Sequence, residues 1–131
     1  MNREILFKAK RKDNGEWVEG CIVIDQSRFD RFKYRIQPIE SGVLYAHPID
    51  PDTLCQYTGL TDKNGKRIWE NDILRNKKGD MGVAQWFEEH AAFMIWNKTK
   101  NCVCYLAEND FSKIEVNGNV FDNPELLEVE K

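Results

Sequence analysis

The sequence predicts a mostly β protein in which an N-terminal antiparallel sheet, over residues 1–60, packs on a C-terminal SH3-like barrel, over residues 61–131, with helix confined to short turns. Hydrophobic and polar residues alternate with a period of two, which is typical of strands with one buried face. Turn-forming groups divide the chain at short intervals, and Asn-Gly suits the positive φ angles of tight hairpins. These groups are Asn14-Gly15, Asn64-Gly65, Lys78-Gly79-Asp80 and Asn117-Gly118.

The N-terminal part is expected to contain four strands. The first, over residues 4–11, places Ile5, Phe7 and Ala9 on one face and lysines on the other. The other three are expected at residues 17–24, 28–36 and 43–47. A helical turn should follow them, because Asp50 is a preferred N-cap residue and Pro51 suits the first helical position.

The C-terminal part changes in character after Gly59. Short aromatic and β-branched segments are joined by tight turns, and each is expected to form a strand; they lie at residues 67–69, 72–76, 81–87, 92–96, 101–106 and 114–116. Several short strands in this length suit a closed barrel, since closure removes most edge strands. A second helical turn is expected at Pro124, where Glu125 complements the helix dipole.

Composition places the chain among folded globular proteins. The 131 residues are 41% hydrophobic and 31% charged, and the net charge is −3. Neither half is basic, so general binding to a phosphate backbone is not indicated. The chain contains no apolar run near the ~20 residues of a membrane helix, and its start does not resemble a signal peptide. We therefore expect a cytoplasmic protein with no membrane partner.

The four cysteines are expected to be reduced and structural. Cys102 and Cys104 are two apart and point to the same side of a strand, whereas Cys21 and Cys55 stand alone. A zinc site would need two ligand pairs, and a disulfide framework is not expected in a reducing compartment. The sequence thus predicts four free thiols, with no metal and no cofactor; zinc or redox chemistry is the alternative.

One long segment carries a specific resemblance. Residues 56–74 read QYTGLTDKNGKRIWENDIL, which resembles the signature of the YopX protein family. The opening segment 3–9, the glycine-led segment 82–86 and the segment 117–127 resemble other parts of the same family, in the same order. One departure is visible, because Glu70-Asn71-Asp72 stands where the family has Glu-Gly-Asp. Asn tolerates left-handed backbone angles better than most residues, so a special turn angle could survive there.

The resemblance implies a β-rich phage or prophage protein of Gram-positive bacteria with an SH3-like C-terminal part. It implies a location in the bacterial host cytoplasm, and it brings no established activity. The signature residues that it marks are Tyr57, Thr58, Gly59, Asp62, Asn64, Gly65, Glu70 and Asp72.

The carboxylates of the signature are the strongest candidates for chemistry. Glu70 and Asp72 are two apart and share one strand face, and Asp62 could join them across the turn. Such a group could bind Mg²⁺ or divide acid and base roles, but a metal site needs more converging ligands than these. The favoured interpretation is a solvated strand start. Because neither histidine has a recognisable partner and there is no Gly-rich phosphate loop, an enzyme is not expected.

A basic face is the second candidate. Arg31, Lys33 and Arg35 alternate with Phe32 and Tyr34 in the strand expected at residues 28–36. Such a face could bind single-stranded nucleic acid by charge and stacking. The favoured interpretation is a half-buried strand with its charges in water, so we expect no specific nucleic-acid binding.

Surplus aromatic residues favour self-association. Four Trp, seven Phe and four Tyr are many for this length. Trp86 and Phe87 point opposite ways in a strand, so one ring faces outward and needs cover. We therefore expect a non-enzymatic accessory protein that forms a homo-oligomer and binds protein, with some of Trp69, Trp86 and Trp96 in the contact. The competing explanation is that the N-terminal sheet covers these rings within one chain.

Overall fold

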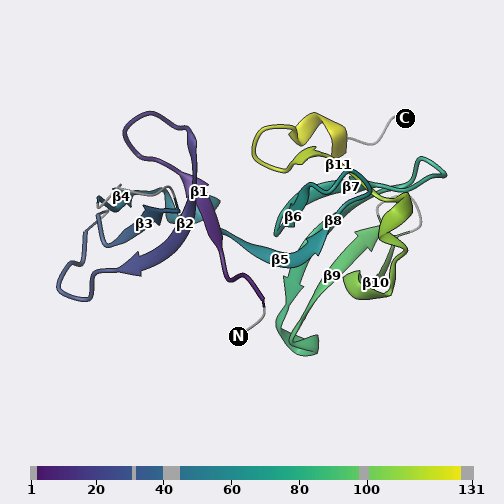
Figure 1. Ribbon diagram of the computed structural model, residues 1–131, viewed down its shortest axis with the longest axis horizontal. Helices are drawn as coiled ribbons and strands as arrows, with labels where there is room; N and C mark the ends of the chain where they lie inside the picture. The colour runs from purple at the N-terminus through teal and green to yellow at the C-terminus, as the bar shows by residue number, and fades with distance from the viewer. Residues whose placement is uncertain (1–2, 31, 40–44, 98–100, 128–131) are drawn as a thin grey trace. The chain divides into compact units, whose positions relative to one another are not determined.

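The computed structural model describes residues 3–30, 32–39, 45–97 and 101–127. The chain divides into two compact units, Met1–Tyr57 and Thr58–Lys131. The described strands belong to two antiparallel sheets, and the helix found in the described residues consists of 3-10 turns of three or four residues (Figure 1). The mostly β, antiparallel class predicted from the alternation is therefore confirmed.

The first unit is built on a sheet with strand order β4-β3-β2-β1-β5, which β6 extends in the second unit. A core of Ala9, Ile36 and Ile49 lies against one face of this sheet. Strand β5 crosses the boundary between the units: Gln56 pairs with Phe7 of β1, and the residues from Thr58 on belong to the second unit. The strands are β1 (Phe7–Lys10), β2 (Trp17–Ile24), β3 (Tyr34–Pro38), β4 (His47–Pro48) and β5 (Cys55–Thr61).

The strand expected at residues 28–36 is wrong over its first half. Strand β3 begins only at Tyr34, because two aspartates fold the preceding residues into turns. Asp25 accepts a hydrogen bond from the Ser27 N–H at 3.0 Å, and Asp30 accepts one from the Phe32 N–H at 3.0 Å. Such local bonds compete with strand formation. Of the strand expected at residues 43–47, residues 43 and 44 lie outside the described residues.

The helical turn expected after Asp50 is confirmed. It is η1 (Pro51–Thr53), and the Asp50 carboxylate accepts a hydrogen bond from the Asp52 N–H at 3.0 Å. Thr53 then ties the turn to β1, since its hydroxyl oxygen accepts a hydrogen bond from the Lys10 N–H at 2.8 Å.

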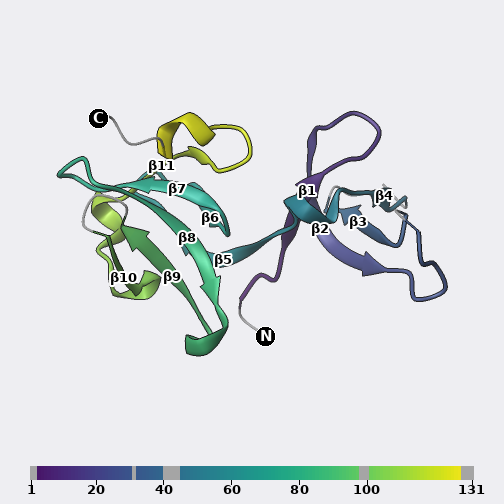
Figure 2. The ribbon, with the colours of Figure 1, turned by 180° about the vertical axis from the view of Figure 1, so that it is seen from behind.

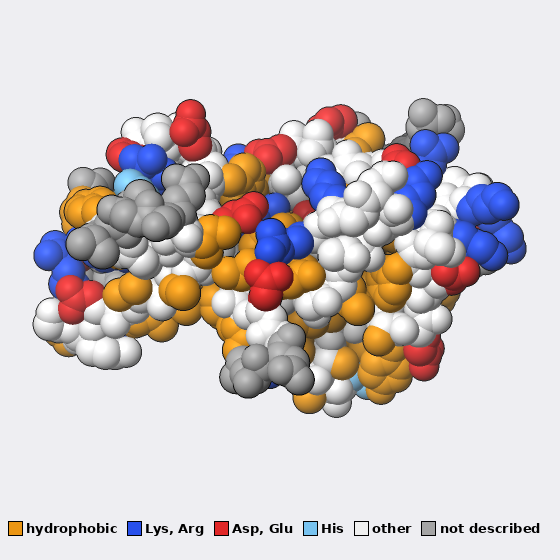
Figure 3. All heavy atoms as spheres, viewed as in Figure 1, with side chains coloured by type: hydrophobic (Ala, Val, Ile, Leu, Met, Phe, Trp, Pro, Cys, Tyr) orange, Lys and Arg blue, Asp and Glu red, His pale blue; other side chains and the backbone are white. Residues whose placement is uncertain are grey.

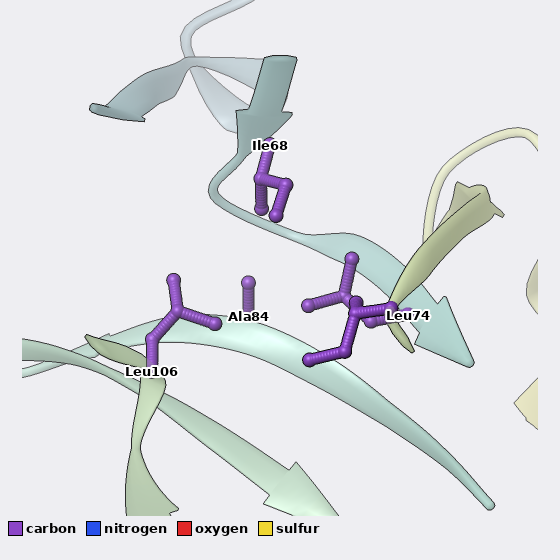
Figure 4. Close-up of a cluster of buried hydrophobic side chains, with 5 residues drawn as sticks. Ile68, Leu74, Ala84 and Leu106 are labelled. Carbon is purple, nitrogen blue, oxygen red and sulfur yellow. The ribbon is translucent and has the colours of Figure 1, made fainter. Parts of the chain in front are cut away.

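The second unit contains a five-stranded sheet with the order β10-β9-β8-β7-β11 (Figure 2). Its core is formed by aliphatic side chains that meet on one face of this sheet, as the close-up of Figure 4 shows. They are Ile68, Leu74, Ala84, Leu106 and Ile114. The strands are β6 (Arg67–Trp69), β7 (Asp72–Arg75), β8 (Met81–Phe87), β9 (Ala92–Asn97), β10 (Cys102–Tyr105) and β11 (Glu115–Asn119).

The closed SH3-like barrel expected for this unit is not found among the described strands. The sheet stays open, with β10 at one edge and β11 at the other, and β6 belongs to the other sheet. Asn117-Gly118, expected as a hairpin turn, instead lies inside β11, where the pairing register with β7 shifts between Val116 and Gly118. Such a shift is a β-bulge, which bends an edge strand.

Short helical turns are more numerous than expected. Two of the turns, η1 and η5 (Pro124–Leu127), lie at the two prolines where helical turns were predicted. Three further turns connect strands of the second unit. They are η2 (Glu88–His90), η3 (Leu106–Glu108) and η4 (Phe111–Lys113). Among the described residues, none of these turns has the length and apolar character that a membrane crossing requires.

Candidate functional site

The signature residues fold into β5, β6, β7 and the two turns between them. Strand β5 was not expected from the sequence, because Gly59 interrupts its pattern; Gly59 has a φ of 89°. Thr58 holds β5 to β6, since its hydroxyl donates to the Ile68 carbonyl at 2.7 Å and lies 3.3 Å from the Leu60 N–H, from which it accepts. The first signature residues therefore have a structural part in the hairpin.

Asp62 is the centre of the first turn. Its carboxylate is buried and accepts three main-chain hydrogen bonds, from Asn64 at 2.8 Å, Lys66 at 2.9 Å and Val116 at 3.0 Å. Gly65 completes the turn with a φ of 78°. Burial by itself raises the pKa of Asp62, but the hydrogen bonds from the Val116, Lys66 and Asn64 N–H groups together outweigh it, so the pKa lies below its usual value. The carboxylate stays ionised and joins two segments of backbone, the β5–β6 turn and β11.

Asp72 stabilises the next turn, between β6 and β7, in a similar way. It is buried, and its carboxylate accepts a hydrogen bond from the Trp69 N–H at 2.8 Å. Asn71, which lies between Trp69 and Asp72, has a φ of 72°. The residue that stands where the family has glycine therefore keeps a left-handed backbone angle. Asn71 also donates its N–H to the Ala84 carbonyl at 2.6 Å, which ties the turn to β8. Glu70 is half-buried beside it.

The carboxylates of Asp62 and Asp72 thus accept hydrogen bonds from main-chain amides. Among the described residues, no group of three or more His, Cys, Asp or Glu side chains is placed to hold a metal ion. The positions of Asp62 and Asp72 differ from the solvated strand start that we expected, because both side chains are buried against N–H groups. The two aspartates of the signature therefore stabilise two successive turns, one between β5 and β6 and one between β6 and β7.

The expected basic face is not assembled as a strand face. Arg31 lies outside the described residues, and Lys33 precedes β3, with its ammonium 5.7 Å from the centre of the Tyr34 ring. Arg35 lies in β3, where its guanidinium donates to the Phe32 carbonyl and to the Ala46 carbonyl, both at 3.2 Å. Arg35 therefore anchors the loops on either side of the strand.

The three candidate tryptophans lie in different surroundings. Trp69 is only 4% exposed, so of the three it offers the least surface to a partner. Trp86 is 45% exposed and packs edge-on against Phe93, with ring centroids 5.1 Å apart. Trp96 is half-buried and pairs with Val103 across β9 and β10.

A surface that sequence analysis missed lies beside Trp96. Val103 and Tyr105 of β10 are each 42% exposed and alternate with Cys104, so they share the face of the sheet on which Trp96 lies. We call Trp96, Val103 and Tyr105 the β9–β10 face. Hydrophobic side chains are visible over these strands in Figure 3. The signal was present in the sequence, because residues 102–105 form a short run without charge.

The cysteines differ in exposure, which gives a prediction. All four carry free thiols; Cys21 and Cys102 are exposed, whereas Cys55 is only 1% exposed. Thiol titration under denaturant should find four groups. In the folded protein, Cys21 and Cys102 should react first and Cys55 last, because a buried thiol is protected from the reagent. A count of two thiols, or stoichiometric zinc in elemental analysis, would contradict this prediction.

Comparison with known proteins identifies the family. A family model described as YopX protein matches residues 6–128. The chain belongs to the YopX protein family. A segment of 68 residues, 52% of this YopX-family chain, is 38% identical to the uncharacterized protein YkkB of Bacillus subtilis (strain 168). That segment covers only 37% of YkkB.

Two crystal structures share the fold of this YopX-family chain. Protein yopX from Bacillus subtilis matches 94% of the chain and 98% of its own length, with a TM-score of 0.58 and 17% identity. Protein EF1440 from Enterococcus faecalis matches 97% of the chain and 100% of its own length, with a TM-score of 0.54 and 22% identity. At these identities the likeness shows a common fold.

Proposed function

We propose that this YopX-family chain is a non-enzymatic phage or prophage accessory protein that acts in the bacterial cytoplasm, without a cofactor, by self-association and protein binding. The observation that carries the proposal is the exposure of Val103 and Tyr105 on β10, an edge strand without charge. The roles of Asp62 and Asp72 in main-chain hydrogen bonding support the non-enzymatic part, because buried carboxylates engaged in this way are not open to a substrate.

The edges of the two sheets are not equally protected. An edge strand offers unpaired N–H and C=O groups, and proteins protect such edges by short length, proline, charge or bulges. In the described residues, β4 has only two residues and includes Pro48, and β6 has three residues. β11 contains Glu115 and a bulge. β10 has four residues, contains neither a charged residue nor proline, and pairs with β9 without a bulge.

A second copy of the chain fits this edge. Two β10 strands related by a two-fold axis would pair antiparallel and continue the sheet from one subunit into the other. A charged strand would bring like charges opposite one another in such a pair, which is unfavourable. Because residues 102–105 carry no charge, β10 avoids this cost. The exposed side chains of Val103 and Tyr105 would then be covered by their symmetry mates, which adds apolar burial to the main-chain hydrogen bonds.

Light scattering after gel filtration tests the proposal. At tens of micromolar protein, the wild-type chain should have twice the mass of one chain. Val103→Glu should have the mass of one chain, because two carboxylates would face each other near the axis. Val23→Glu is the matched control, since Val23 is 39% exposed on β2 of the other unit, and it should remain a dimer.

Two results would contradict the proposal. A wild-type monomer at this concentration would exclude self-association and leave docking within one chain as the account of the aromatic residues. Equal dissociation of Val103→Glu and Val23→Glu would show that β10 is not the contact. A different alternative is that the chain is an enzyme whose site includes Glu70 and Asp72. An increase in the melting temperature of the chain on addition of Mg²⁺ would favour that alternative.

A further inference from the structure

One groove in the second unit is cationic, although the chain as a whole is acidic. It has a volume of about 600 Å³ and lies entirely within the second unit. Four of its lining residues are basic and one is acidic: Lys63, Arg75, Lys77, Lys113 and Glu115. Figure 3 shows Lys and Arg side chains gathered over the turn that joins β7 and β8, which forms one wall of the groove.

The wall formed by the β7–β8 turn is held by the side chain of Asn76. Its amide oxygen accepts hydrogen bonds from the Lys78 N–H and the Asp80 N–H, both at 3.0 Å. The Gly79 N–H closes the turn on the Asn76 carbonyl at 3.0 Å. Arg75 and Lys77 therefore project from an ordered backbone, which lowers the entropic cost of bringing their charges to a ligand.

The opposite wall is held in the same way. Asp110 accepts hydrogen bonds from the N–H and the hydroxyl of Ser112, at 3.0 and 2.6 Å, and so fixes η4, which ends at Lys113. Lys63 is held by its own N–H, which donates to the Ile114 carbonyl at 2.9 Å. Segments distant in sequence thus converge on one groove.

The charges of the groove are available to a ligand. Lys63 pairs with Glu115 at 3.0 Å and Lys113 pairs with Asp110 at 3.7 Å, and both pairs are exposed. Exposed ion pairs contribute little and exchange readily for another anion. In the part of the chain that the structure describes, neither Arg75 nor Lys77 forms an ion pair.

We propose that this groove binds the phosphodiester backbone of a nucleic acid, independently of base sequence. Several separated cations match a ligand with repeated negative charges better than one small anion. Asn76 and Ser112 also line the groove, but their side chains are engaged in the turns that form its walls, so the cations carry the binding. The lining includes no aromatic side chain on which bases could stack, so a duplex should bind at least as tightly as a single strand. This surface is distinct from the basic strand face considered from sequence.

Fluorescence anisotropy with the full chain tests the proposal. The probes are a labelled duplex of about 20 base pairs with random sequence and the corresponding single strand. If the four cations each neutralise one phosphate, duplex affinity should fall by about 150-fold between roughly 50 and 200 mM salt. The variant Arg75→Glu, Lys77→Glu, Lys113→Glu should weaken binding at least about tenfold. It should also reduce the slope of the logarithm of the binding constant against the logarithm of the salt concentration by about 3.

A matched control separates the groove from net charge. The variant Arg3→Glu, Lys12→Glu, Lys33→Glu makes the same change in charge on the first unit and should keep most of the affinity at a fixed salt concentration. If the groove variant loses its circular dichroism spectrum, the neutral set Arg75→Gln, Lys77→Gln, Lys113→Gln replaces it. The proposal is overturned if the wild type does not bind at low salt, or if the groove and control variants lose affinity equally. It is also overturned if inorganic phosphate or an acidic peptide binds in the groove but the oligonucleotides do not.

Discussion

Replacement of Asp62 by alanine should lower the free energy of unfolding of the second unit by about 3 kcal/mol, measured by urea denaturation. The variant leaves the N–H groups of Asn64, Lys66 and Val116 without their acceptor, and removes the link between the β5–β6 turn and β11. Hydrogen bonds to a charged group are the stronger kind, and loss of one partner leaves the others unsatisfied. Peptide-resolved hydrogen exchange should locate the loss in residues 58–131.

Two comparisons sharpen this prediction. Asp62→Asn keeps the shape of the side chain but sets an NH₂ group against one of the N–H donors, so it should have an intermediate cost. Asp110→Ala is the matched control, because Asp110 also accepts from a main-chain N–H two residues on, but is exposed. Its cost should be much smaller than that of Asp62→Ala, because the side chain is exposed and water can replace it. Equal losses at Asp62 and Asp110 would contradict a central role for the buried carboxylate.

The same carboxylate makes stability depend on pH. Its pKa is lower in the folded chain than in the unfolded chain, so the unfolded chain binds more protons at acid pH. The contribution of Asp62 to stability is therefore complete above the unfolded pKa of about 4 and is lost as the pH falls through the lower folded value. The slope of stability against pH in this range should be smaller in Asp62→Asn than in the wild type.

Local patterns in the sequence predicted most strands, because alternation and turn chemistry act over a few residues. The ranges expected for β2, β6 and β8 agree with the structure at both ends. β5 was missed because Gly59, which has a φ of 89°, breaks the alternation of the strand. At residues 28–30 and 32–33, the side chains of Asp25 and Asp30 favour turns over a strand.

The candidate sites depend on contacts that sequence patterns do not contain. Asp62 was marked by the family resemblance, but its role rests on the N–H of Val116, 54 residues away. The cationic groove likewise joins Lys63, Arg75 and Lys113, which lie in separate segments with no shared periodicity. The open edge at β10 follows from strand order, which alternation does not specify. Local reasoning therefore predicted elements better than it predicted surfaces.

The first unit should be most sensitive to substitution of Gly20. In β2, this residue lies against β3, and a Cβ atom added to it would lie 1.9 Å from the Gln37 carbonyl oxygen and 2.8 Å from the Gln37 carbonyl carbon. Both neighbours are backbone atoms of a paired strand, so neither can move without breaking the ladder between β2 and β3. Overpacking of this kind costs about 3 kcal/mol. Gly20→Ala should therefore lower the free energy of unfolding of the first unit by that amount.

Two controls distinguish the close approach from other effects of adding a methyl group or changing β2. Gly15→Ala adds the same Cβ where no atom lies within 4 Å, so it should cost only the strain of its φ of 72°, about 1 kcal/mol. Cys21→Ala changes the neighbouring exposed position in β2 and should be close to neutral. Hydrogen exchange of peptides from residues 3–30 should show the order Gly20, Gly15, Cys21 in loss of protection. If Gly20→Ala were no less stable than Cys21→Ala, the spacing of β2 and β3 would be wider than the structure has it, and the core of Ala9, Ile36 and Ile49 would not depend on the close approach at Gly20.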